Sequence, residues 1–405
     1  MASTVSLRGP IQRTSEEAVA IGYLRALVVL LVLAHHSILA YHPFAPFPQA
    51  SLAAEPRWWR GFPIVDSQRS IALLLLATFN DIFLMTLLFL VSGLFVWPSW
   101  RRRGTWGFLR RRLVRLGVPF LVAATLLTPV AYVPSYLVTS GERGVAGFLD
   151  AWLAMGLFPG AAGPAWFLWV LLAFDTVAAA LLALVPGSRE WLGRTVVRAR
   201  DHPAAFFGLL VAVSAVAYLP LALAVGPATW STFGPFTIQT SRCLHYLVYF
   251  LAGMALGIYG LERGPLAATG SLARYWDRWV VLAVLAFVLV GGAFLATPTS
   301  EIASHKWTAV AGCVFVLSCA ASSCAALAVC IRFLRTRTKL LDSLRDNSYG
   351  MFVVHFVFVT WLQYALLRAR LPAVAKGTLV FLGTAGLSWS VSATLRRVPA
   401  IARVI

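Results

Sequence analysis

The sequence predicts an all-α integral membrane protein, a bundle of about ten membrane-spanning helices, and three observations predict it. The chain of 405 residues is 60% hydrophobic and only 12% charged. Its apolar residues form blocks of roughly 18 residues or more, long enough to cross the hydrocarbon core of a bilayer. Its basic residues cluster between these blocks, as they do in the loops of membrane proteins.

Ten apolar blocks are expected to span the membrane. Several are apolar all round, so lipid and not water is their expected solvent. An even number of spans places both termini on one side. In chain order the blocks are Ile21–Tyr41, Ile71–Trp97, Leu116–Val138, Ala165–Val185, Ala204–Val225, Leu244–Leu261, Trp279–Ala296, Thr308–Cys330, Tyr349–Leu367 and Gly377–Leu395.

The formal charge of +19 follows from topology and does not indicate a nucleic-acid partner. The amino terminus and alternate loops hold 24 of the 34 Lys and Arg residues, and the opposite loops hold 8. This bias predicts cytoplasmic termini and a multi-pass protein of the cell membrane, either a plasma membrane or a bacterial inner membrane. Residues 1–20 and 396–405 are expected to be cytoplasmic tails that flank a transmembrane domain of residues 21–395.

The first span carries two ionisable side chains on one face. Arg25 and His36 are eleven residues apart, which is three helical turns plus about 20° and a rise of roughly 16 Å. His35 is rotated by about 100° from that face. The spacing suits a polar track from a cytoplasmic anion to a buried base. The alternative is a snorkelling Arg25 and a hydrogen-bonded interface histidine at His36.

The segment after the second span is rich in arginine, and we expect it to turn through a loop before Pro119. A short helix there presents Arg112 and Arg115 together at i, i+3, beside Arg111. Arginine pairs of this kind suit bidentate binding of phosphate or carboxylate. Positive-inside topology explains most of these arginines without a ligand, so both interpretations remain open.

Further polar or aromatic residues in the spans are candidates for lining the same cavity, although each is equally consistent with an interhelical hydrogen bond. Gly253 and Gly257 are expected to form a helix-packing face. The sequence has no metal-ligand spacing, P-loop or dinucleotide-binding motif, so we expect no metal and no permanently bound cofactor. The cavity candidates are Asn80, Asp81, Ser92, Trp166, Arg242, Ser348, Tyr349 and His355.

The order of these elements resembles that of the membrane acyltransferase-3 family, and the glucan-succinylating branch is the nearest. The resemblance covers nearly the whole chain. Its first and third motifs are fairly specific in combination, whereas the Ser-Gly and Trp-Phe motifs are weak alone. The motifs are Arg25 with His36, Phe89–Phe95 (FLVSGLF), Phe108–Pro119 (FLRRRLVRLGVP), Gly163–Leu168 (GPAWFL) and Ser348–His355 (SYGMFVVH).

The resemblance implies transfer of an acetyl or succinyl group from cytoplasmic acyl-CoA, a co-substrate, to a hydroxyl of an envelope glycan or a glycosylated small molecule. His36 is then the base or a transient acyl carrier, because a buried neutral imidazole accepts a proton. Arg25, Arg111, Arg112 and Arg115 are then expected to bind anionic parts of the donor. Pro164 stands where the glucan branch often has histidine, so the resemblance leaves the substrate class open.

Two other classes of function remain as alternatives. A secondary transporter or flippase also places Arg, Asp and His in its spans, but the sequence shows no inverted repeat. A non-catalytic partner of a glycan pathway would tolerate the loss of His36. The outer-loop tryptophans Trp58, Trp59 and Trp230 are expected to be interface anchors more than sugar-stacking platforms.

Overall fold

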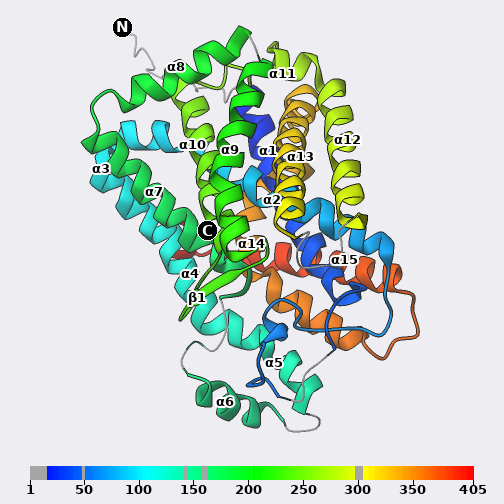
Figure 1. Ribbon diagram of the computed structural model, residues 1–405. Helices are drawn as coiled ribbons and strands as arrows, with labels where there is room; N and C mark the ends of the chain where they lie inside the picture. Colours follow the sequence, from blue (N-terminus) through cyan, green and yellow to red (C-terminus); the bar gives the residue numbers. More distant parts are fainter. Residues whose placement is uncertain are drawn as a thin grey trace, which may run out of the picture.

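The computed structural model (Figure 1) is a bundle of helices with one small β-hairpin. It describes residues 16–47, 51–140, 144–156, 158, 162–201, 203–296 and 304–405. The α-helices are α1 Glu16–Ile38, α2 Ile71–Leu94, α3 Val96–Arg112, α4 Val118–Val122, α5 Thr128–Ser140, α6 Val145–Ala154, α7 Trp166–Leu184, α8 Ser188–Asp201, α9 Pro203–Val225, α10 Cys243–Tyr259, α11 Ser271–Arg274, α12 Trp276–Leu295, α13 Ser304–Phe333, α14 Lys339–Leu366, α15 Ala373–Leu395 and α16 Pro399–Ala402.

Short helical segments and the hairpin complete the chain. Strands β1 Trp230–Phe233 and β2 Phe236–Gln239 pair antiparallel. Segments η3 Leu113–Gly117 and η4 Ala123–Leu127 are π-helical. The 3₁₀ segments are η1 Leu39–Tyr41, η2 Trp58–Arg60, η5 Gly163–Ala165 and η6 Thr240–Arg242.

Ten helical segments within the described residues are long and apolar enough to cross a membrane. Each overlaps one of the ten spans expected from the sequence, so the prediction of a polytopic all-α membrane protein is confirmed. The segments are Glu16–Tyr41, Ile71–Leu94, Val96–Thr139, Gly163–Leu184, Pro203–Val225, Thr240–Tyr259, Trp276–Leu295, His305–Phe333, Lys339–Leu366 and Ala373–Leu395.

Helix α1 lies inside the bundle, and α12 lies at its edge (Figure 1). Helix α1 packs against α2, α13, α14 and α15, and it buries apolar side chains along its whole length. Helix α12 packs mainly on α13 and exposes Val281, Val284, Leu285 and Val288. An exposed apolar surface of this kind suits contact with lipid.

Helices α2 and α10 approach each other closely at glycines. A Cβ atom added at Gly253 would lie 1.9 Å from the carbonyl oxygen of Leu90, and one at Gly257 would lie 2.2 Å from that of Leu94. No larger side chain fits at this contact. The prediction that these two glycines serve helix packing is confirmed.

The predicted loop before Pro119 is wrong, because the arginine-rich segment forms helix α3. Gly104, with φ of 68°, interrupts the helical backbone inside α3. The chain then continues through η3 and η4 as one long span that ends at Thr139. Helix α6 and the β-hairpin also form where loops were expected, since loop lengths alone do not reveal short elements that pack on the bundle.

Both ends of the described chain contain folded segments. Helix α1 begins at Glu16, inside the expected tail of residues 1–20, and Arg8 and Arg13 lie outside the described residues. Glu16 forms an ion pair of 3.3 Å with Arg335, just before α14. At the other end, α16 forms and Ile405 lies beside Gly350 of α14, so residues 396–405 are part of the folded structure.

Candidate active site

A cavity of about 510 Å³ opens among α1, α2, α3, η3, α7, α14 and the carboxyl-terminal residues. This volume is typical of small-molecule and cofactor sites. Among the described residues, eight arginines and a single carboxylate, that of Asp346, line it. The arginines are Arg25, Arg102, Arg103, Arg111, Arg112, Arg115, Arg345 and Arg396.

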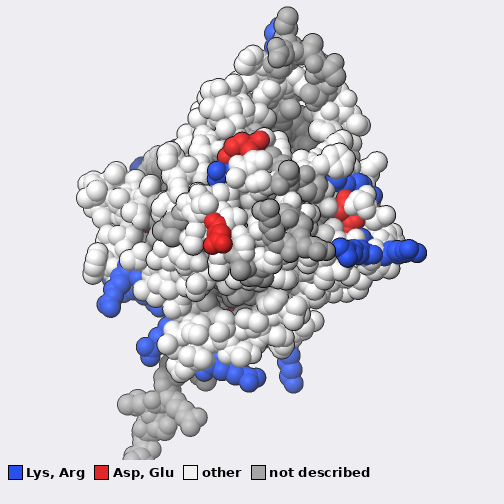
Figure 2. Space-filling view, turned by 90° about the horizontal axis from the view of Figure 1, so that it is seen from below, with Lys and Arg blue, Asp and Glu red and all other residues white. Residues whose placement is uncertain are grey.

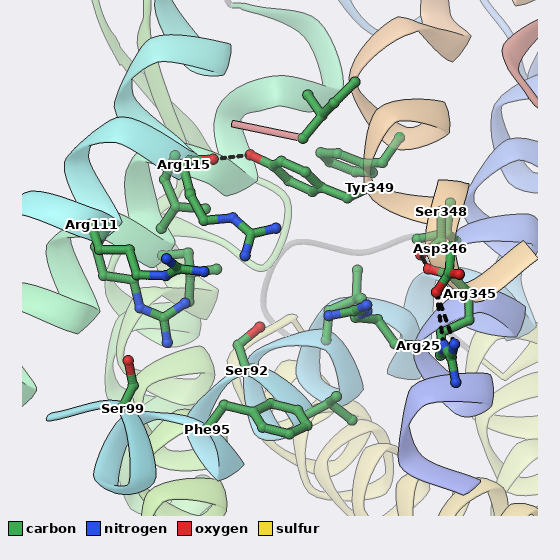
Figure 3. A pocket seen from close by; sticks show the side chains of 18 of the residues that line it. Arg25, Ser92, Phe95, Ser99, Arg111, Arg115, Arg345, Asp346, Ser348 and Tyr349 are labelled. Carbon is green, nitrogen blue, oxygen red and sulfur yellow. Dashed lines mark hydrogen bonds and ion pairs between the residues drawn. The ribbon is translucent and has the colours of Figure 1, made fainter. Parts of the chain in front are cut away.

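The arginines face one another across the cavity (Figure 3). Arg111 and Arg115 reach in from one wall, and Arg25 and Arg345 from the opposite wall. Arg25 is exposed although its neighbours in α1 are buried, because its side chain enters the cavity. The structure therefore brings all four sequence-predicted arginines to one place, together with Ser92, Ser348 and Tyr349.

The π-helical segment η3 sets the position of Arg115. Pro119 has no N–H, so it makes no α-helical hydrogen bond to the carbonyl of Arg115 four residues earlier. The hydroxyl of Tyr349 in α14 donates to that carbonyl instead. A π-helical turn with a tertiary partner is a common feature of functional sites. Tyr349 thereby ties the two cationic walls of the cavity together.

Arg112 and Arg345 already have carboxylate partners, unlike their neighbours. The Nε atom of Arg112 lies 3.1 Å from Oδ2 of Asp175, a fully buried side chain in α7. Arg345 pairs with Asp342 at 3.0 Å and with Asp346 at 2.9 Å. These contacts hold two arginines in place at the cavity.

The other six arginines of the cavity lack carboxylate partners among the described residues, and three of them belong to the set predicted from the sequence. Arg25, Arg111 and Arg115 take part in none of the ion pairs found in the described part of the chain. Guanidinium groups that are gathered without counter-charges favour an anionic ligand, because the ligand would relieve their mutual repulsion. These three are the best candidates for direct contact with one.

The inner end of the cavity is apolar. Val29, Leu88, Val91, Phe167 and Phe352 line it. Val29 follows Arg25 by one helical turn on α1, and Phe352 follows Ser348 by one turn on α14. The cavity therefore changes from cationic to apolar as it follows these two helices into the bundle.

A pair of histidines lies just beyond this apolar end. The rings of His36 in α1 and His355 in α14 are 5.3 Å apart, and the ring of His355 is 5.8 Å from that of Phe352. Gln363 donates hydrogen bonds of 2.9 and 3.2 Å to the carbonyls of His36 and Ser37. His35 contacts the ring of His36 edge-on but does not contact that of His355. His36 and His355 are 319 residues apart in the sequence, and the packing of α1 on α14 brings them together.

The remaining predicted residues lie outside the arginine-lined cavity. Arg242 pairs with Asp81 at 2.7 Å, linking η6, just before α10, to α2, and its guanidinium packs over Phe315. Asn80 is fully buried nearby in α2. Trp166 packs against Trp230 and Tyr246. These side chains lie in contacts between elements and do not line the cavity.

Reasoning from the sequence missed some residues of the cavity and one residue, Gln363, that contacts the end of α1 at His36. Arg345 and Arg396 belong to basic clusters that positive-inside topology explains, so nothing in the sequence set them apart. Phe352 looks like any apolar residue of a span. Gln363 carried the one available signal, since it is an uncharged polar residue in an apolar helix.

The fold and the cavity together define a multi-pass membrane protein with a cationic binding cavity beside a histidine pair. Residues 19–393 match the acyltransferase-3 family model, described as an acyltransferase domain. The chain therefore belongs to this family of membrane acyltransferases. No curated protein and no solved structure matches the chain.

Proposed function

We propose that the protein is a membrane-bound O-acyltransferase. It takes an acetyl or succinyl group from cytoplasmic acyl-CoA and transfers it to a hydroxyl of an envelope glycan or a glycosylated small molecule. One observation carries the proposal: a cavity lined by eight arginines becomes apolar and ends beside a histidine pair. A donor with an anionic head and a reactive acyl end would match both parts.

The cationic part of the cavity suits the phosphates of coenzyme A. Arginine binds phosphate oxygens with paired charge-assisted hydrogen bonds. Arg25, Arg111 and Arg115 are the candidates for these contacts, and Arg112 lines the same cavity while paired with Asp175. The pantetheine arm would then extend along Val29 and Phe352 toward His36.

The histidine pair suits the chemistry of acyl transfer. A thioester is already activated, so the enzyme needs a base for the acceptor hydroxyl and polar groups for the developing oxyanion. His36 would accept the hydroxyl proton as oxygen attacks the thioester carbon. The aromatic and aliphatic side chains around it would keep bulk water away and so limit hydrolysis.

The proposed orientation places the arginine cavity and both termini on the cytoplasmic side of a plasma or bacterial inner membrane. The positive-inside bias supports this orientation. The opposite face, at the α6 end, carries scattered basic side chains near its rim and a few acidic ones, some of them near its middle, and is otherwise uncharged (Figure 2). A neutral carbohydrate acceptor would approach from that side.

The test uses purified protein in nanodiscs with acetyl-CoA or succinyl-CoA labelled in the acyl group. Transfer of label to crude envelope glycan is followed for the natural chain and for His36→Asn. We expect transfer by the natural chain and a loss of about 10³-fold in the variant, as for removal of a general base. Binding of the donor should be unchanged, because His36 does not line the cavity.

The control is His35→Asn, which removes the adjacent histidine on a different face of α1. Its loss should stay below about tenfold, since His35 is not paired with His355. Flux of a donor or glycan across the membrane without a covalent product would instead indicate a transporter. Unchanged glycan modification with His36→Asn would indicate a non-catalytic partner.

A further inference from the structure

His355 has a ring nitrogen that the fold leaves unused. Its Nδ1 lies 2.6 Å from the carbonyl oxygen of Phe352. A carbonyl only accepts, so Nδ1 carries the hydrogen and Nε2 of the neutral ring carries the lone pair. The side chain is fully buried, and Nε2 has no hydrogen-bond partner among the described residues. A buried acceptor without a partner is costly and requires an explanation.

The position of His355 supplies that explanation. Its ring contacts Phe352, which lines the donor cavity, and also His36, which does not. Ser348, Phe352 and His355 recur at i, i+4 and i+7, so they share one face of α14. His355 therefore lies between the inner end of the cavity and His36. Its other ring neighbour, Phe356, offers no polar atom.

We propose that His355 is a second catalytic residue, which delivers a proton to the sulfur of the leaving coenzyme A. This inference rests on the proposed acyltransferase function. It assigns the base and acid roles to two histidines, His36 on the acceptor side and His355 on the donor side.

The proton balance of the step is complete. The acceptor hydroxyl gives its proton to one nitrogen of His36 while its oxygen bonds to the thioester carbon. His36 passes the proton of its other nitrogen to Nε2 of His355. As the C–S bond breaks, its electron pair goes to sulfur, and Nε2 of His355 protonates the thiolate. The products are the ester and the free thiol, and both histidines are neutral again.

The test variant is His355→Asn. The amide nitrogen of asparagine takes the place of Nδ1 and keeps the hydrogen bond to the Phe352 carbonyl, while the group equivalent to Nε2 is lost. We expect kcat for transfer from acetyl-CoA to fall by about 10²-fold, with little change in KM for the donor. His355→Gln, which places its amide near the Nε2 position, is measured in the same way should the first variant not fold.

The matched control is His245→Asn, because His245 in α10 is also fully buried. Its kcat and KM should stay within roughly threefold of the natural values.

Transfer by His355→Asn near the natural rate would overturn the proposal, since the residue would then serve only its bond to Phe352. An equal loss of kcat in His245→Asn, or a change confined to KM, would also overturn it. Absence of transfer by the natural chain from any acyl-CoA would refute the acyltransferase function itself. That outcome is distinct from an active natural chain with an active His355→Asn.

Discussion

The arginine-lined cavity and the histidine pair are built on the same two helices, α1 and α14, yet their environments are opposite. Arg25 and Arg345 face an open, cationic space, whereas His36 and His355 lie behind Phe352 among aromatic side chains. Each of the two helices thus carries a cation suited to an anion near one end. Further along, each carries a histidine, a proton acceptor, among aromatic side chains. The contrast predicts that donor binding depends on the arginines and acyl transfer on the histidines. Variants of the arginine cavity should therefore change KM for the donor, and variants of the histidine pair should change kcat.

The largest expected effect concerns the buried anchor of the cavity. Asp175→Asn removes the carboxylate partner of Arg112 and leaves a partly buried guanidinium unpaired. Breaking such a pair should lower the free energy of unfolding by about 3 kcal/mol. KM for acyl-CoA should not rise, because Arg112 loses a competing anion. Thermal unfolding in detergent and steady-state kinetics check both expectations, with Asp150→Asn on the exposed side of α6 as the control.

The next effect separates binding from chemistry. Arg115→Ala should raise KM for acyl-CoA by roughly 10-fold to 100-fold, the equivalent of one lost charge-assisted hydrogen bond. The value of kcat should change little. Arg110→Ala is the matched control, since Arg110 is an exposed neighbour in α3 that does not line the cavity. Equal effects of the two variants would mean that only general surface charge matters.

A smaller effect is expected at the histidine pair. Gln363→Leu leaves the carbonyls of His36 and Ser37 without its hydrogen bonds and loosens the end of α1. A small displacement of His36 should lower kcat by about tenfold and leave KM for the donor unchanged. Donor binding at equilibrium and kcat are measured together. A rise in KM without loss of kcat would break the proposed division between the two regions.

The smallest effect is expected at the arginine-lined cavity, for loss of a single hydrogen bond. Tyr349→Phe removes the hydroxyl that donates to the carbonyl of Arg115. A lost hydrogen bond of about 1 kcal/mol should raise KM for acyl-CoA by about fivefold. Tyr364→Phe, elsewhere in α14, should change neither constant. A loss of kcat in Tyr349→Phe, at unchanged KM, would place Tyr349 with the histidines and not with the arginines.

Local periodicity was enough to predict part of the candidate site. The common face of Arg25 and His36 follows from 100° per residue, and the clustering of Arg111, Arg112 and Arg115 follows from their spacing. The same reasoning failed at α3, where a helix kinked at Gly104 stands in place of the expected loop. Contacts between distant segments had no local signal at all.

The sequence by itself determined that this protein lies in a lipid bilayer and how many spans it has. Apolar blocks of bilayer length have no other stable environment, and their backbone groups must then pair within helices. Only the tertiary structure decided which ionisable groups meet. The proximity of His36 to His355, of Arg112 to Asp175 and of Tyr349 to Arg115 depends on side-chain packing between helices, and helix periodicity carries no information about the neighbouring helix.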